Sequence, residues 1–290
     1  MALTINTNMS SLIVQKNLNA ATSMLNKSIE RMTTGYKINH AADNAAGYSI
    51  ATTWKTQLGS LDVASDNAST GADMLTTLED TYSLITSHLQ RVRDLTEQAA
   101  NGTYGSDSLK AIASEITARL EEIDRISANC EFNGLKMMDG SLTDDINLQV
   151  GLYSDAASRI ALDASLFQNG HVSALFKTFG GVGGATVAEV AKLCSGYDGK
   201  QITGGQNEML NKIDAVISEI SARTTTLGAA QNRIESAVES INVQSENITS
   251  SLSTLRDADV AEESSNYIKA QILQQASATL LATANQTDRK

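Results

Sequence analysis

The fold of this chain is decided by a stretch near its end, residues 210–255, which reads LNKIDAVISEISARTTTLGAAQNRIESAVESINVQSENITSSLSTL. Apolar residues return every three or four positions along it, as they do on one stripe of a coiled-coil helix. At about 1.5 Å per residue the helix is roughly 67 Å long, too long for the interior of a compact domain. We therefore expect a rod with partner helices. The register comprises Leu210, Ile213, Ile217, Ile220, Thr224, Leu227, Gln231, Ile234, Val238, Ile241, Ser245, Ile248, Leu252 and Leu255.

Four other stretches have the same helical period: residues 10–36, 68–99, 109–126 and 258–285. None of the 290 residues is proline, which breaks helix interiors because it lacks an N–H and clashes with the preceding turn. The apolar band of 258–285 is broader than a two-stranded seam requires. This width favours burial on more than one side, although packing against the N-terminal helix alone would be the simpler explanation.

One segment has the two-residue period of a half-buried strand instead. Ile146, Leu148, Val150 and Leu152 alternate with polar residues, and Ile160 and Leu162 alternate again after a polar stretch. These predict a β-hairpin, preceded by a turn at Asn133-Gly134. Residues 166–205 are glycine-rich and irregular, with a short helix near 186–195. The fold class predicted is mainly α: a long antiparallel coiled-coil or helical-bundle rod built from both termini, with a small β-hairpin region.

Composition excludes several classes of function. The net charge is −11 and no basic stripe carries interleaved aromatics, which argues against nucleic-acid binding. No run of apolar residues is long enough for membrane insertion, and the start lacks the basic-then-apolar layout of a secretory signal. Cys130 and Cys194 form no CxxC pair, so we expect both to be unpaired.

The sequence carries no pattern typical of catalysis, metal binding or cofactor binding. His40, His88 and His171 lie in three different segments, and no H-E-x-x-H is present. The glycines at 180–184 are not followed by the Gly-Lys-Ser/Thr of a phosphate-binding loop, and there is no G-x-S-x-G. We therefore expect no enzyme activity, no cofactor and no metal site.

Seven short segments, in order along the chain, resemble bacterial flagellin. They are residues 5–8 (INTN), 32–39 (MTTGYKIN), 42–47 (ADNAAG), 90–95 (QRVRDL), 131–136 (EFNGLK), 227–233 (LGAAQNR) and 270–276 (AQILQQA). The resemblance implies that residues 1–44 and 257–290 are inner filament-core helices. It implies further that 45–165 is the N-terminal part of a rod domain with the hairpin, 166–205 a short variable surface region and 206–256 the C-terminal rod helix.

The resemblance also implies a function: a structural subunit that polymerises into the bacterial flagellar filament for swimming motility. The chain would be extracellular, in the flagellum, and exported without a cleaved signal peptide. Its partners would be other flagellin subunits, a flagellar export chaperone and the export apparatus, and the filament cap and hook-associated proteins. Terminal segments that order only on assembly would couple folding to association.

Two sets of residues are predicted to carry these interactions. Burial of apolar stripes at both termini would drive self-assembly. A host Toll-like receptor of innate immunity would contact the rod at Gln90, Arg91, Leu95 and Glu115, although Leu95 can equally be a seam residue and Arg91 a solvated charge. The predicted self-assembly residues are Leu18, Leu25, Ile29, Met32, Ile268, Ile272, Leu273 and Leu280.

The chain departs from the family at its end, where relatives continue past Ala284-Asn285-Gln286 into an apolar tail and this chain has Thr287-Asp288-Arg289-Lys290. The charged ending fits a C-terminally shortened flagellin or a natural variant, and it bears on whether the innermost layer is complete. The alternatives are a hook–filament junction protein and a non-flagellar coiled-coil interaction protein.

Overall fold

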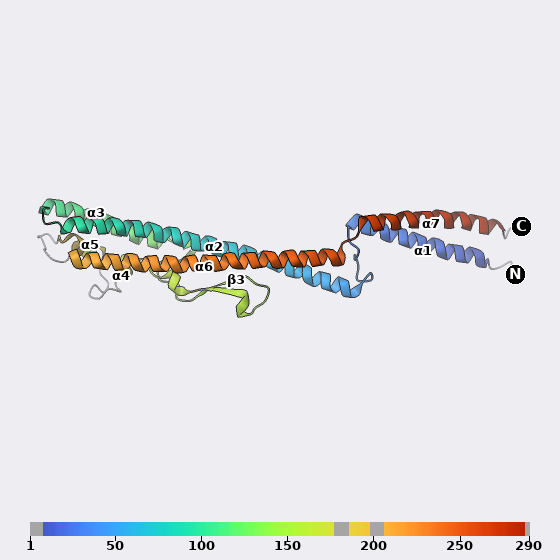
Figure 1. Ribbon diagram of the computed structural model, residues 1–290, viewed down its shortest axis with the longest axis horizontal. Coiled ribbons are helices and arrows are strands. Elements are labelled where there is room, and N and C mark those ends of the chain that lie inside the picture. Colours follow the sequence, from blue (N-terminus) through green and yellow to red (C-terminus); the bar gives the residue numbers. More distant parts are fainter. Residues whose placement is uncertain (1–7, 177–185, 198–205, 288–290) are drawn as a thin grey trace. The chain divides into compact units, whose positions relative to one another are not determined.

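The computed structural model describes residues 8–176, 186–197 and 206–287 (Figure 1). Its contacts divide the chain into two compact units. Unit 1 comprises residues 1–59 and 244–290, and unit 2 comprises residues 60–243. The helices α2 (Ala45–Ala100) and α6 (Gln206–Arg256) contribute residues to both units. The boundaries predicted at 44/45 and 256/257 follow helix ends, whereas the contacts group 45–59 and 244–256 with the terminal helices.

Unit 1 is centred on two antiparallel helices, α1 (Met9–Thr34) and α7 (Val260–Thr287) (Figure 1). α1 begins after Asn8, whose Oδ1 accepts the backbone N–H of Ser11 at 2.8 Å, and ends at Gly35. Gly35 has a φ of 73°, a left-handed conformation that glycine adopts at little cost. Asn8 Nδ2 donates to the carbonyl of Ala284 at 3.2 Å, so the beginning of α1 lies beside the end of α7.

The segments that follow α1 and precede α7 are joined to each other. The backbone N–H of Lys37 donates to the carbonyl of Arg256 at 2.6 Å, and that of Ala258 donates to the carbonyl of Gly35 at 2.9 Å. The Arg256 guanidinium lies 4.1 Å from the centre of the Tyr36 ring, a cation–π contact. These contacts hold the end of α1 next to the start of α7.

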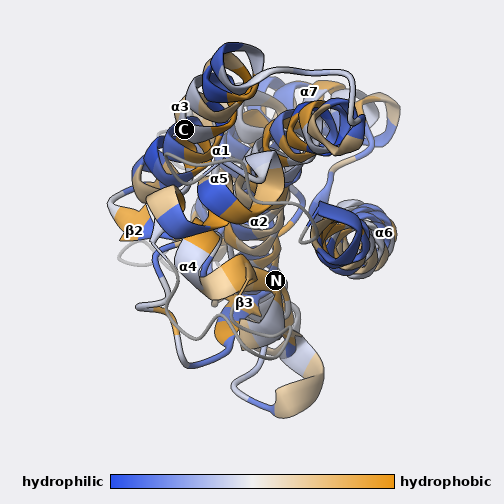
Figure 2. Ribbon diagram, turned by 90° about the vertical axis from the view of Figure 1, so that its left-hand side faces the viewer, coloured by the Kyte–Doolittle hydropathy of each residue, from blue (hydrophilic) through white to orange (hydrophobic). Residues whose placement is uncertain are grey.

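Unit 2 contains α3 (Ser106–Asn129) and the adjoining lengths of α2 and α6. Within this unit, α2 and α6 run antiparallel to each other. Arg93 Nε on α2 is 2.6 Å from Asp214 Oδ1 on α6, and Arg91 on α2 pairs with Glu115 on α3 at 2.8 Å. Each helix shows both hydrophobic and hydrophilic residues around its axis, as expected for helices that bury one stripe (Figure 2). The deeply buried side chains of these three helices include Leu75, Leu78, Tyr82, Ile85, Leu89, Val92, Ile116, Leu120, Ile123, Ile213, Val216, Ile220, Leu227 and Ile234.

The predicted stripe of the long C-terminal helix is confirmed at Ile213, Ile220, Leu227 and Ile234, with one difference. Its first part buries Met209 and Val216, while Leu210 and Ile217 are half-buried. Ala230 is likewise buried next to a half-buried Gln231. One of the two rows of buried residues therefore lies one residue earlier than predicted, and the other row is as predicted.

Two small antiparallel strand pairs lie in unit 2. The predicted hairpin is confirmed as β3 (Ile146–Gln149) and β4 (Arg159–Leu162), with Ile146 opposite Leu162. The turn predicted at Asn133-Gly134 closes a second pair, β1 (Glu131–Phe132) and β2 (Leu135–Lys136). Both turn residues have positive φ, 48° and 81°, as in the tight turns that Asn-Gly favours.

β3 packs directly against the backbone of α2. A Cβ placed on Gly71 would lie 2.3 Å from Leu148 Cδ1, so only glycine leaves room for this side chain. Asn67 Nδ2 on the same helix donates to the carbonyl of Gln149 at 3.1 Å. Because residue 71 has no side chain, Leu148 of β3 can pack against the backbone of α2.

A 3-10 turn, η1 (Ala156–Ser158), lies between the two strands of the hairpin. The chain between the hairpin and α6 forms a second 3-10 turn, η2 (Ala164–Phe167), and the helices α4 (Val172–Leu175) and α5 (Val187–Ser195). α5 confirms the short helix predicted near 186–195 and starts with a capping box between Thr186 and Glu189. The glycines at 180–184 and 204–205 and the charged residues 288–290 lie outside the described residues. Long helices with small antiparallel strand pairs confirm the mainly α fold class.

Candidate assembly surface of the terminal helices

The seam between α1 and α7 is made of small side chains. Ala21 and Ser28 on α1 and Ala270 and Ser277 on α7 are buried, together with the carboxylate residue Glu263. Among the described residues of these two helices, no large apolar side chain is fully buried. Alanine and serine let two helix backbones approach closely, but they remove little apolar area from water.

The large apolar side chains of α1 and α7 lie on the surface instead. Six of the eight predicted assembly residues are exposed: Ile29 (44%), Met32 (39%), Ile268 (53%), Ile272 (59%), Leu273 (42%) and Leu280 (57%). Leu18 and Leu25 are half-buried along the edge of the seam. Scattered apolar residues are normal on a protein surface, whereas many large ones on one pair of helices favour an interaction surface.

Sequence reasoning missed further members of this surface, because a three-to-four-residue step selects only one stripe of a helix. The broad apolar band noted for residues 258–285 was the available signal for α7. The additional exposed residues are Met9, Leu12, Ile13, Met24 and Val260. We refer to these five residues and the eight predicted ones together as the terminal apolar surface.

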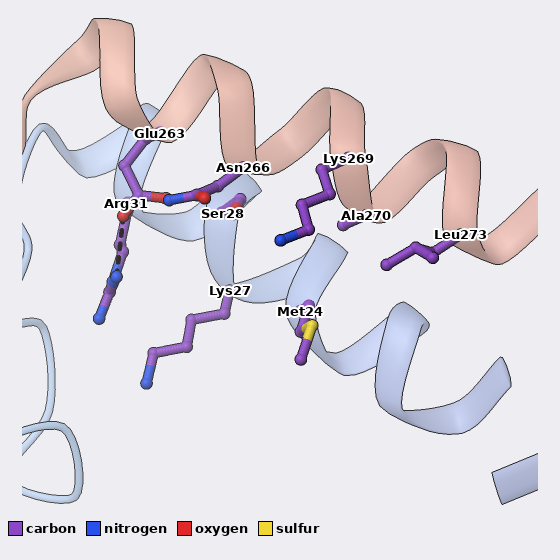
Figure 3. A pocket seen from close by; sticks show the side chains of 9 residues that line it. All are labelled: Met24, Lys27, Ser28, Arg31, Glu263, Asn266, Lys269, Ala270 and Leu273. Atoms are coloured by element: carbon purple, nitrogen blue, oxygen red, sulfur yellow. Dashed lines mark hydrogen bonds and ion pairs between the residues drawn. The ribbon is translucent and has the colours of Figure 1, made fainter. Parts of the chain in front are cut away.

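A groove of about 310 Å³ lies between α1 and α7 (Figure 3). Met24 and Leu273 form its apolar part, on opposite helices, and the ion pair of Arg31 with Glu263 closes its other end at 2.8 Å. Its remaining lining residues are Lys27, Ser28, Asn266, Lys269 and Ala270.

The loop after α1 is held to that helix by charge. Lys27 Nζ lies 2.7 Å from Asp43 Oδ1, and Asp43 Oδ2 accepts the backbone N–H of His40 at 3.2 Å. The hydrogen bond from Lys27 and then that from His40 lower the pKa of Asp43 from 3.8 to about 2. His40 Nε2 lies 2.8 Å from Glu30 Oε1.

The predicted receptor-contact residues lie on α2 and α3 in unit 2. Gln90 and Arg91 are exposed, and Arg91 Nε donates to Glu115 Oε1 at 2.9 Å. Leu95 is only 2% exposed and packs in the interior of unit 2. Leu95 therefore supports this surface from beneath, and only the other three residues can be contacted directly.

The groups with possible chemistry are dispersed or buried. Across residues 8–176, 186–197 and 206–287, no three His, Cys, Asp or Glu side chains are grouped so that they could hold a metal ion. Burial raises the pKa of the Cys194 thiol to about 12 and raises that of Cys130 as well, which disfavours the reactive thiolate. No helix within the same described ranges is long and apolar enough to span a membrane.

Comparison with known proteins assigns the family. The family model described as the bacterial flagellin N-terminal helical region matches residues 5–143, and that of the bacterial flagellin C-terminal helical region matches residues 210–290. Flagellin from Bacillus subtilis (strain 168) is 33% identical over 300 residues, with 97% of this chain and 96% of that protein covered. Flagellin FlaB1 from Treponema pallidum (strain Nichols) is 31% identical over 286 residues, with the same coverage.

Among solved structures, a putative flagellar hook-associated protein from Vibrio parahaemolyticus has a TM-score of 0.62 at 12% identity, covering 74% of this chain and all of that one. This likeness shows the fold alone and does not favour the junction-protein alternative. With both family models matched and relatives above 30% identity aligned over nearly the full chain, this protein belongs to the bacterial flagellins, the structural subunits that polymerise into the flagellar filament for motility.

Proposed function

We propose that the terminal apolar surface is where one copy of this chain binds the next in the filament. One observation carries the proposal: α1 and α7 pair through alanine and serine, while their isoleucines, leucines and methionines stay in water. Full burial of such a side chain contributes about 1.5–3 kcal/mol, so burying the exposed half contributes about 1 kcal/mol each. Several such residues together stabilise a contact between copies that a single chain cannot make.

Polymerisation of purified chain tests this proposal. Replacing Ile268 and Ile272 by serine should raise the concentration of free chain that coexists with filaments by about tenfold or more, since about 2 kcal/mol of burial is lost. Tyr153→Ser, at a residue of unit 2 that is 64% exposed, is the matched control and should leave that concentration unchanged. Sedimentation and electron microscopy measure it. Equal free concentrations for parent and double variant would refute the proposal.

Membership of the flagellin family supports the predicted domains, partners and location. We propose that residues 1–44 and 257–290 form the inner filament core, that 45–165 and 206–256 form the rod and that 166–205 is the surface region. We also place the chain outside the cell, exported without a cleaved signal peptide, with the cap and hook-associated proteins at the filament ends.

An apolar helix such as α7 needs cover before assembly, which is the role of an export chaperone. Ile268→Ser and Ile272→Ser should weaken chaperone binding in a pull-down, and undiminished binding would argue against it.

For the Toll-like receptor we propose Gln90, Arg91 and Glu115 as direct contacts, with Leu95 beneath them. The alternative is that the Arg91–Glu115 pair only ties α2 to α3. Arg91→Ala should lower receptor signalling in reporter cells, whereas Arg125→Ala, which breaks the exposed Arg125–Glu122 pair of α3, should not. Equal signalling by both variants and the parent would exclude the contact.

We infer that the chain has no catalytic role, cofactor or metal of its own. The raised pKa values of both cysteines and the dispersed histidines support this inference. Assembly, with the chain's own copies as the main partner, remains the function that the described residues support best.

A further inference from the structure

The faces through which α1 and α7 meet repeat every seven residues. On α1 the buried residues Ala21 and Ser28 are seven apart, and on α7 Glu263, Ala270 and Ser277 are each seven apart. Sliding one helix past the other by seven residues, about 10 Å, would place small side chains against small side chains again. The packing of this seam therefore does not select one alignment of the two helices.

One interaction breaks the repeat. Arg31 Nη1 lies 2.8 Å from Glu263 Oε1, and Glu263 is 6% exposed (Figure 3). Glu263 is the one charged residue that is buried among those the structure describes. Because the helices are antiparallel, the seven-residue slide that brings Ala270 opposite Arg31 carries Glu263 beyond Thr34, where α1 ends. The slide in the other direction places Glu263 opposite the apolar Met24. Either slide breaks the Arg31–Glu263 ion pair, and the second leaves the carboxylate against an apolar side chain, which is strongly unfavourable.

We propose that the Arg31–Glu263 ion pair sets the register of α1 against α7 and thereby aligns their exposed apolar residues into one surface for a second copy. The alignment is visible in the groove, where Met24 of α1 and Leu273 of α7 lie on either side (Figure 3). A slide would separate these two side chains by about two helical turns. The second half of this inference rests on the proposed assembly function, whereas the first half does not.

Engineered disulfides can report the register in the full chain. Gln274 Nε2 donates to Thr22 Oγ1 at 3.2 Å, so cysteines at 22 and 274 report the observed alignment. The slide that brings Ala270 to Arg31 also brings Leu281 opposite Thr22, so cysteines at 22 and 281 report the shifted one. Both pairs are placed in four backgrounds: the parent, Glu263→Gln, the charge swap Arg31→Glu with Glu263→Arg, and Glu262→Gln. Glu262 is the exposed neighbour on the same helix and supplies the matched control.

Disulfide yields are measured in sedimented filaments, where the terminal segments are expected to be ordered. We expect the 22–274 disulfide to dominate in the parent, in Glu262→Gln and in the charge swap. In Glu263→Gln the ratio of the 22–281 to the 22–274 disulfide should rise by about tenfold or more, because the observed alignment no longer gains the ion pair that the shifted one lacks. The free chain concentration at equilibrium with filaments should rise in the same variant.

The outcomes separate the two halves of the inference. An unchanged disulfide ratio in Glu263→Gln overturns the register role, whatever happens to polymerisation. Loss of both disulfides also overturns it, because the pair would then hold the helices together without choosing between alignments. A changed ratio with normal polymerisation confirms the register role and overturns its link to assembly, while the Ile268/Ile272 variant still tests the assembly surface independently.

Discussion

Gly71 is the position at which the hairpin and the long helix α2 are most tightly fitted, and Gly71→Ala tests this fit. Two effects oppose each other. In an open helix interior, replacing glycine by alanine stabilises the fold by about 1 kcal/mol, because glycine loses more backbone entropy on folding. At residue 71, however, the new Cβ would lie 2.3, 3.2 and 3.3 Å from Cδ1, Cδ2 and Cγ of Leu148.

Steric repulsion should win at this site. Carbon atoms pack best at about 3.5–4.0 Å, and all three branch atoms of Leu148 are closer than that. To relieve these contacts Leu148 must leave its observed rotamer or β3 must shift away from α2. Overpacking of this kind costs about 1–3 kcal/mol. After subtracting the helix gain, we expect Gly71→Ala to lower the free energy of unfolding by about 1–2 kcal/mol.

Urea unfolding followed by circular dichroism measures the change. Gly228→Ala on α6 is the matched control, because a Cβ there meets nothing within 4 Å, and it should stabilise the chain by about 1 kcal/mol. In the Gly71→Ala background, Leu148→Ala should recover most of the loss, since it removes the clashing atoms. The reasoning is wrong if Gly71→Ala raises the urea midpoint as Gly228→Ala does.

Three other predictions concern the loops and the cysteines. Gly35→Ala should destabilise unit 1 by about 1 kcal/mol, because residue 35 has a φ of 73°; an unchanged melting temperature of filaments would contradict this. The pKa of Asp43 falls from 3.8 unfolded to about 2 folded, so its contribution to stability is present above pH 3.8 and is lost as the pH falls toward 2. Asp43→Asn should therefore lower stability at neutral pH and flatten its decline between these values, and a parallel pH profile of thermal melting would refute the assignment. Cys194, with a pKa raised to about 12, should resist a thiol reagent at pH 8 until the chain is unfolded, and rapid labelling of the native chain would show that the site opens.

Much of the fold was predictable because long helices give a strong periodic signal. α6 and α7 were predicted to within four residues at their ends, since a period of 3.6 sustained over many turns has no competing explanation. β3 and β4 were found because alternation survives even in four residues. β1 and β2 have two residues each, too few for any alternation, and only their Asn-Gly turn was visible.

The terminal helices show where periodicity stops being informative. Their apolar stripes selected Ile268 and Ile272, which are exposed, as assembly residues. They did not predict that the seam itself is built from residues such as Ala21 and Ser277. Alanine and serine give almost no hydrophobic signal, so a seam of small residues is invisible to a pattern of large ones. The Arg31–Glu263 pair was equally hidden, because its partners lie 232 positions apart and nothing local links them.

The alanine and serine seam makes order in α1 and α7 depend on position along the polymer. A helix pair that removes little apolar area from water is marginal alone, because most helical stability in proteins comes from tertiary packing. On the proposed assembly, a subunit in mid-filament has neighbours over its whole terminal apolar surface, whereas a subunit at an end lacks some of them. The two helices should therefore fray at filament ends, and amide hydrogen exchange in α1 and α7 should quicken as filaments are sheared shorter.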